Sequence, residues 1–62
     1  MTEEEAEAIR PGDVVYWDDG EREEQYRLVI IKIVKRSGLW VIDSDDFSEL
    51  ECFAEDLFLE RV

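Results

Sequence analysis

Carboxylates are the chemically active groups that this sequence has in excess. Its 62 residues include 18 Asp and Glu, 7 Lys and Arg and no histidine, so the formal net charge is −11 at pH 7. Without histidine the chain lacks the commonest general base, and its serines have no partner for a hydrolase triad. No glycine-rich phosphate loop is present either. We therefore expect no catalytic residues and a protein that is not an enzyme.

The carboxylates form two clusters, one from Asp18 to Glu24 and one from Asp43 to Asp46. The second cluster has the spacing of the start of a calcium loop. An EF-hand also needs glycine at its sixth position and glutamate at its twelfth, where this chain has Ser48 and Ala54. An acidic hairpin turn is the favoured interpretation, with weak cation binding as the alternative. One cysteine without histidine makes no zinc site, so we expect no metal and no cofactor.

The single cysteine, Cys52, excludes an internal disulfide. A buried, inert thiol is the favoured interpretation, because a reactive thiol needs a nearby cation and this neighbourhood is acidic. The first residues lack the basic and apolar regions of a signal peptide. The longest uncharged run, 37–42, is too short to cross a membrane. A cytoplasmic location is therefore expected.

The elements that must position the carboxylates are predicted to be strands. A long polar loop separates the first two strands, and short turns separate the second, third and fourth. Aromatic and β-branched residues dominate the strands, and the longest segment has too many β-branched residues for a helix. The predicted strands are Val14–Trp17, Tyr26–Arg36, Leu39–Ile42, Glu49–Ala54 and Phe58–Arg61. The residues 54–57 break the alternation of the fourth strand and are expected to form a single 3₁₀ turn.

The alternation of apolar residues slips in the middle of the second predicted strand. One face of the strand would carry Tyr26, Leu28 and Ile30, whereas the other face would carry Ile31 and Ile33. Such a slip predicts a bulge or a sharp bend. The expected core consists of Val14 or Val15, Leu28, Ile31, Ile33, Val41, Leu50, Cys52 and Leu57.

Residues 1–9 form an acidic leader before this strand-rich region. Thr2 can cap a short helical turn, with Glu5 completing a capping box. So few residues without an apolar stripe rarely hold a helix alone. We therefore expect a frayed segment, and deletion of Thr2–Ala8 should change the free energy of unfolding by less than about 1 kcal/mol.

The order of these elements resembles the SH3-like small barrels, the group that includes Tudor and KOW domains. Gly12–Trp17, Tyr26–Ile31 and Glu55–Leu57 carry the resemblance. It implies an all-β fold at residues 10–62, a five-stranded antiparallel SH3-like barrel with a 3₁₀ turn before the last strand. The chain is also similar to short bacterial proteins with a Gly-Asp-x-Val-x-Trp opening and a Glu-x-Leu close, a likeness that brings no function with it.

The chain departs from the better-known members of this group. It lacks the Ala-Leu-Tyr-Asp-Tyr pattern of peptide-binding Src-type SH3 domains and the basic residues of a nucleic-acid-binding KOW domain. A Tudor-type aromatic cage needs several rings on one rim. Trp17, Tyr26, Trp40 and Phe47 are the candidates, but two or three of them are expected in the core.

The charge decides which partners are plausible. An acidic surface disfavours a nucleic-acid backbone and an anionic membrane, and it attracts basic proteins. We therefore predict a non-catalytic protein-binding module that engages a basic partner through acidic residues and one exposed aromatic residue. The candidate residues are Trp17, Asp18, Asp19, Glu21, Glu23, Glu24, Asp43, Asp45 and Asp46.

The alternative is a nucleic-acid mimic of the phage or mobile-element type, which blocks a DNA- or RNA-binding protein. A mimic needs rows of carboxylates over a large continuous surface, whereas a binding module needs one acidic patch beside an apolar anchor. A third possibility is a structural or accessory domain of a larger assembly. The acidity can also serve only to keep the protein soluble.

Added sodium chloride should raise the melting temperature of the protein, because salt screens the repulsion among the excess carboxylates. Thermal unfolding followed by circular dichroism across a range of salt concentrations measures this effect. A melting temperature that falls with salt would show that attractive charge pairs outweigh the repulsion.

Overall fold

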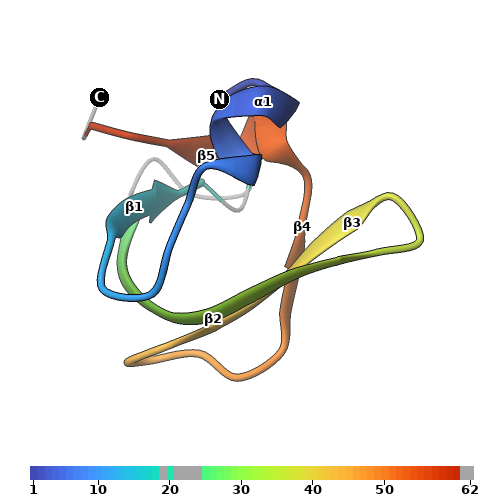
Figure 1. Ribbon diagram of the computed structural model, residues 1–62. Helices are drawn as coiled ribbons and strands as arrows, with labels where there is room; N and C mark the ends of the chain where they lie inside the picture. Colours follow the sequence, from blue (N-terminus) through green and yellow to red (C-terminus); the bar gives the residue numbers. More distant parts are fainter. Residues whose placement is uncertain (19, 21–24, 61–62) are drawn as a thin grey trace.

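The computed structural model describes residues 1–18, 20 and 25–60. Five antiparallel strands form one sheet in the order β4-β3-β2-β1-β5 (Figure 1). The elements are α1 (Glu3–Glu7), β1 (Val14–Trp17), β2 (Tyr26–Arg36), β3 (Leu39–Ser44), β4 (Leu50–Cys52), the 3₁₀ turn η1 (Ala54–Asp56) and β5 (Leu57–Phe58). The all-β prediction and the 3₁₀ turn before the last strand are confirmed. The outer strands β4 and β5 do not pair with each other in the described residues, so the sheet is not closed.

The strand ends differ from the sequence-based expectation in three places. β3 continues to Ser44, because Ser44 still pairs with Ile30 of β2. β4 is limited to Leu50–Cys52. β5 begins at Leu57, opposite Trp17 of β1, and ends at Phe58. The predicted end of that strand at Arg61 lies outside the described residues.

β2 bends in its middle and pairs with a different neighbour on each side of the bend. Its first half pairs with β1, with Trp17 opposite Tyr26, and its second half pairs with β3. The register with β3 shifts between Ile30 and Lys32, which confirms the predicted bulge. Ile31 is the extra residue in this bulge, and its side chain is 60% exposed. Its predicted place in the core was wrong, and Ile30 is buried instead.

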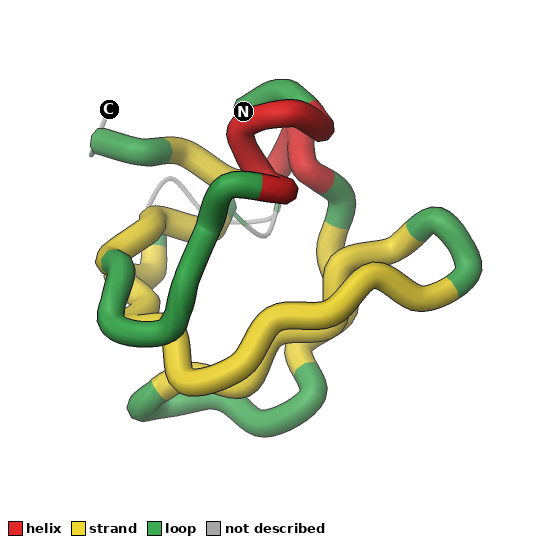
Figure 2. Tube along the Cα trace, viewed as in Figure 1, coloured by secondary structure: helices red, strands yellow, loops and turns green. Residues whose placement is uncertain are grey.

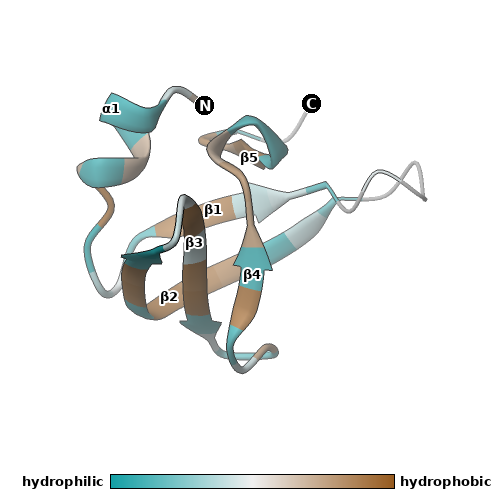
Figure 3. Cartoon of the chain, turned by 90° about the vertical axis from the view of Figure 1, so that its right-hand side faces the viewer, coloured by the Kyte–Doolittle hydropathy of each residue, from teal (hydrophilic) through white to brown (hydrophobic). Residues whose placement is uncertain are grey.

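The core lies between the sheet and the segments that cover it. Figure 3 shows the hydrophobic stretches of β2 and β3 side by side. Of the expected core residues, Ile33 and Leu50 are only partly buried and pack against the core. Five expected residues are buried, namely Val15, Leu28, Val41, Cys52 and Leu57. The buried apolar residues outside the expected set are Ala6, Ile9, Ile30, Trp40, Ile42 and Ala54.

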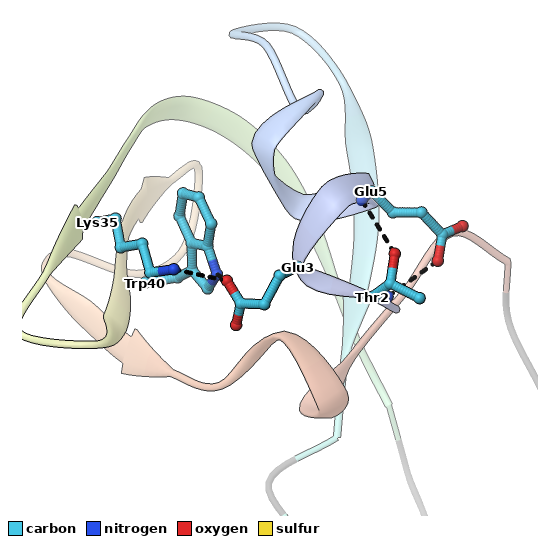
Figure 4. Close-up of polar contacts among 5 residues, drawn as sticks. All are labelled: Thr2, Glu3, Glu5, Lys35 and Trp40. Carbon is cyan, nitrogen blue, oxygen red and sulfur yellow. Dashed lines mark hydrogen bonds and ion pairs between the residues drawn. The ribbon is translucent and has the colours of Figure 1, made fainter.

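The N-terminal segment packs against the sheet. The predicted capping box is present, because the Thr2 N–H donates to Glu5 Oε1 at 2.9 Å and the Glu5 N–H donates to Thr2 Oγ1 at 3.1 Å (Figure 4). Ala6 and Ile9 are buried in the core, and the Met1 amino group donates to the Ala54 carbonyl at 3.0 Å. In Figure 2 the helix lies next to the 3₁₀ turn, and residues of the two elements are in contact.

Glu3 ties α1 to the hairpin formed by β2 and β3. Its Oε2 accepts from Lys35 Nζ at 2.9 Å and from Trp40 Nε1 at 3.2 Å (Figure 4). The hydrogen bond from Lys35 holds the pKa of the Glu3 carboxyl below its usual value. The Lys35 ammonium also lies 5.4 Å from the centre of a Trp40 ring. These contacts hold a helix that is too short to be stable by itself.

These contacts correct the view of residues 1–9 as a frayed leader. That view assumed that no side chain of the segment faces the core, yet Ala6 and Ile9 are both buried there. A residue that is buried among apolar neighbours contributes to stability whether or not its own helix would form in isolation.

Ile9→Ala should lower the free energy of unfolding by about 2–4 kcal/mol, because it leaves a cavity in the core. Ile31→Ala is the matched control, since the same atoms are removed from an exposed position, and its effect should stay within about 0.5 kcal/mol. Urea unfolding followed by tryptophan fluorescence measures both. Equal effects of the two substitutions would contradict the packing of the N-terminal segment.

Candidate functional site

Three aromatic side chains from distant parts of the chain meet at the surface. Trp17 ends β1, Tyr26 begins β2 and Phe47 lies in the loop between β3 and β4. The Trp17 and Tyr26 rings are stacked with their centres 5.4 Å apart. Phe47 meets Trp17 edge-on at 5.6 Å and Tyr26 at 5.5 Å. We call Trp17, Tyr26 and Phe47 the aromatic trio.

Backbone pairing explains why these three rings meet. Trp17 and Tyr26 are opposite each other in the β1–β2 ladder, which places their side chains next to each other on one face. Phe47 is held by Ser44, because the Phe47 N–H donates to Ser44 Oγ at 3.1 Å and the Ser44 N–H donates to the Phe47 carbonyl at 2.8 Å. All three rings are half-buried and pack against the core.

Three of the four aromatic residues proposed for a cage therefore come together, and Trp40 does not. Trp40 is buried in the core and donates to Glu3. The rings of the trio contact one another, as aromatic pairs do at centre distances of about 4.5–7 Å. The trio is thus a packed cluster with partly exposed rings. A ring face of this kind attracts cations through its quadrupole.

The second acidic cluster, Asp43, Asp45 and Asp46, shapes the loop that carries Phe47. Asp45 Oδ1 accepts from the Val29 N–H at 3.1 Å, and Asp43 Oδ1 accepts from the Glu49 N–H at 2.7 Å. Asp46 is exposed, and its carboxylate accepts no hydrogen bond from any described residue. Among residues 1–18, 20 and 25–60, no three Asp, Glu, Cys or His side chains gather to hold a metal ion.

The first acidic cluster is described only where it joins β1. The Asp18 carboxylate accepts from the Gly20 N–H at 2.8 Å, and the Asp18 N–H donates to the Asp56 carbonyl at 3.0 Å. The remaining candidates of this cluster, Asp19, Glu21, Glu23 and Glu24, lie outside the described residues. Asp18, the first residue of this cluster, therefore directly follows Trp17 of the aromatic trio.

A groove of about 360 Å³ lies beside Trp17 and contains residues that the sequence analysis did not propose as a site. Its lining comes from the end of β1, the start of β3, β4 and η1, namely Trp17, Asp18, Leu39, Glu51, Cys52, Phe53 and Asp56. One signal was available in the sequence. Side chains in a strand alternate between its two faces. The fourth predicted strand turns Leu50, Cys52 and Ala54 toward the core. Glu51 and Phe53 must therefore face outward.

Cys52 lines this groove but is buried, as expected. Burial raises the pKa of its thiol to about 11, and the nearby Asp56 carboxylate adds to the effect. The thiol is therefore protonated at neutral pH, and the reactive form of a cysteine is the thiolate.

Ion pairing is sparse in the part of the chain that the structure describes. In the described part of the chain the only ion pair joins Lys35 and Glu3. Four of the basic residues, Arg27, Lys32, Lys35 and Arg36, lie on β2 with exposed side chains. The basic residues of the described part of the chain are thus concentrated on one strand.

No protein-family model matches the chain, and neither a curated protein nor a solved structure matches it. No helix in the described residues is long and apolar enough to cross a membrane. Function must therefore be inferred from the side chains and their geometry.

Asp45→Ala should destabilise the protein by about 0.5–1.5 kcal/mol, because the Val29 N–H loses its hydrogen-bond partner. Asp46→Ala is the matched control. It removes the same charge from the same loop without breaking a hydrogen bond, so its effect should stay within about 0.5 kcal/mol. Chemical unfolding of both variants at one salt concentration makes the comparison. A loss for Asp46→Ala as large as that for Asp45→Ala would show that charge, and not the hydrogen bond, matters in this loop.

Proposed function

We propose that the chain is a non-catalytic protein-binding module that engages a basic segment of a partner protein with the aromatic trio and the carboxylates beside it. The observation that carries this proposal is the meeting of Trp17, Tyr26 and Phe47 at the surface. In the sequence, Trp17 directly precedes one acidic cluster and Phe47 directly follows the other. The trio therefore joins the two acidic segments around one apolar anchor.

This combination suits a lysine or arginine side chain. A cation over an aromatic ring gains about 0.5–1 kcal/mol at an exposed site and about 2 kcal/mol when water is excluded. Aromatic residues also dominate the energetic centres of protein interfaces. The surrounding carboxylates guide basic partners to the site over longer distances.

We also propose that the five strands belong to the SH3-like small-barrel class. The support lies in the bent β2, which pairs with both β1 and β3, and in the 3₁₀ turn before β5. The cytoplasm is the proposed location, because the free Cys52 suits a reducing compartment.

The nucleic-acid mimic remains the second proposal, and the basic residues weigh against it. A mimic must present carboxylates over a large continuous surface. The exposed side chains of Arg27, Lys32, Lys35 and Arg36 interrupt the acidic surface along β2. A localised site at the trio needs no such continuity.

Phe47→Ala should weaken binding of a fluorescein-labelled octalysine peptide about fivefold, by loss of one ring from the trio. The substitution leaves the net charge at −11, so attraction by charge alone predicts no change. Fluorescence anisotropy at increasing salt measures the affinity. Binding to the unaltered chain should weaken as salt rises.

Leu59→Ala is the control, because Leu59 is exposed and apolar but does not belong to the trio. It should leave the affinity unchanged. Equal affinities of the Phe47→Ala variant and the unaltered chain would contradict the proposed site. If, in addition, each carboxylate that is neutralised anywhere on the surface costs the same affinity, the mimic becomes the better explanation.

A further inference from the structure

The groove beside Trp17 combines an apolar lining with carboxylates. Phe53 contributes a side chain that is 53% exposed, and Leu39 and Trp17 are half-buried. Asp18, Glu51 and Asp56 contribute the carboxylates. A volume of about 360 Å³ is within the range of small-ligand pockets.

The backbone fixes the positions of the groove's acidic residues. The Asp18 N–H donates to the Asp56 carbonyl at 3.0 Å, which holds the end of β1 against η1. Glu51 lies in β4, where it pairs with Val41 of β3. Asp56 belongs to η1 and lines the groove together with Glu51.

Two of the carboxylates in this groove are not neutralised by any residue that the structure describes. The carboxylates of Glu51 and Asp56 accept no hydrogen bond from a described residue and form no ion pair with one. An exposed phenylalanine and two unpaired carboxylates in one groove are complementary to a ligand that is both apolar and cationic.

We propose that this groove is a subsite for an arginine side chain of the partner's basic segment, an inference that rests on the proposed function. Arginine has an apolar stem that packs along Phe53 and Leu39. Its planar guanidinium stacks on aromatic rings and forms paired hydrogen bonds with carboxylates. Lysine suits the groove less well, because its ammonium is more strongly hydrated and cannot bridge two carboxylates in the same way.

Other occupants fit the groove less well. Nucleic-acid phosphates would be repelled by the carboxylates that line it. A second copy of the chain carries the same net charge of −11, so its approach is opposed over long distances. A separate basic segment meets neither obstacle.

Nuclear magnetic resonance of the complete ¹⁵N-labelled chain tests the proposal with three peptides of matched length. They are acetyl-Ala-Arg-Ala-amide, the same peptide with lysine, and the same peptide with citrulline, the neutral isostere of arginine. The arginine peptide should shift the amide signals of Leu39, Phe53 and Asp56. It should bind about threefold or more tightly than the lysine peptide, as expected for a cation stacked on a ring, and the citrulline peptide should bind least.

Asp56→Asn should weaken binding of the arginine peptide about two- to fivefold, as expected for one partly exposed charge pair. Glu55→Gln is the matched control. It removes one charge from the same 3₁₀ turn, but Glu55 does not line the groove, so the affinity should not change. Phe53→Ala keeps every charge and should also weaken binding. The ¹⁵N spectrum of each variant shows that it is folded.

The outcomes separate this proposal from the function on which it rests. Shifts confined to Tyr26 and Phe47, with equal affinities for arginine and lysine, would overturn the arginine subsite and leave the binding module intact. No binding of either cationic peptide at any position would overturn both. Shifts in the groove that depend only on protein concentration would overturn the arginine subsite in favour of a second copy as the occupant.

Discussion

The bend in β2 is the constraint on which the rest of this structure depends. One strand must pair with β1 over its first half and with β3 over its second half. The bulge between Ile30 and Lys32 absorbs the change of direction by turning one extra residue, Ile31, out to solvent. In a regular strand without the bulge, Ile30 and Ile33 would face opposite sides of the sheet, because they are three residues apart. Only one of them could then face the core.

Strand pairing on the two sides of this bend brings the aromatic trio together. β1 pairs with the first half of β2, which places Tyr26 next to Trp17. The loop after β3 is then close enough for Asp45 to accept from the Val29 N–H, and Phe47 reaches the other two rings. A site made from three separate segments thus depends on how one strand pairs with both of its neighbours.

Two groups of carboxylates among the described residues differ in what they contact. Glu3, Asp43 and Asp45 accept hydrogen bonds that hold the helix and the loop after β3 in place. Glu51 and Asp56 line the groove beside Trp17 and have no such partner in the described residues. A high negative charge costs stability through self-repulsion, and the first group offsets part of that cost. The second group remains available to a cation, which is why the proposed binding surface lies at the trio and the groove and not over the whole molecule.

The sequence by itself determined the features that depend on residues close together in the chain. The β-branched runs predicted the strands, the slip within Tyr26–Arg36 predicted the bulge, and Thr2 with Glu5 predicted the capping box. Only the tertiary structure decided which way residues at the bulge face, so Ile31 was misplaced. It also decided that Ala6 and Ile9 are buried, since a segment of a few residues shows too little periodicity to reveal a buried side. The trio and the groove are tertiary as well, because strand pairing and loop contacts bring together residues that are distant in the chain, and no local pattern encodes that distance.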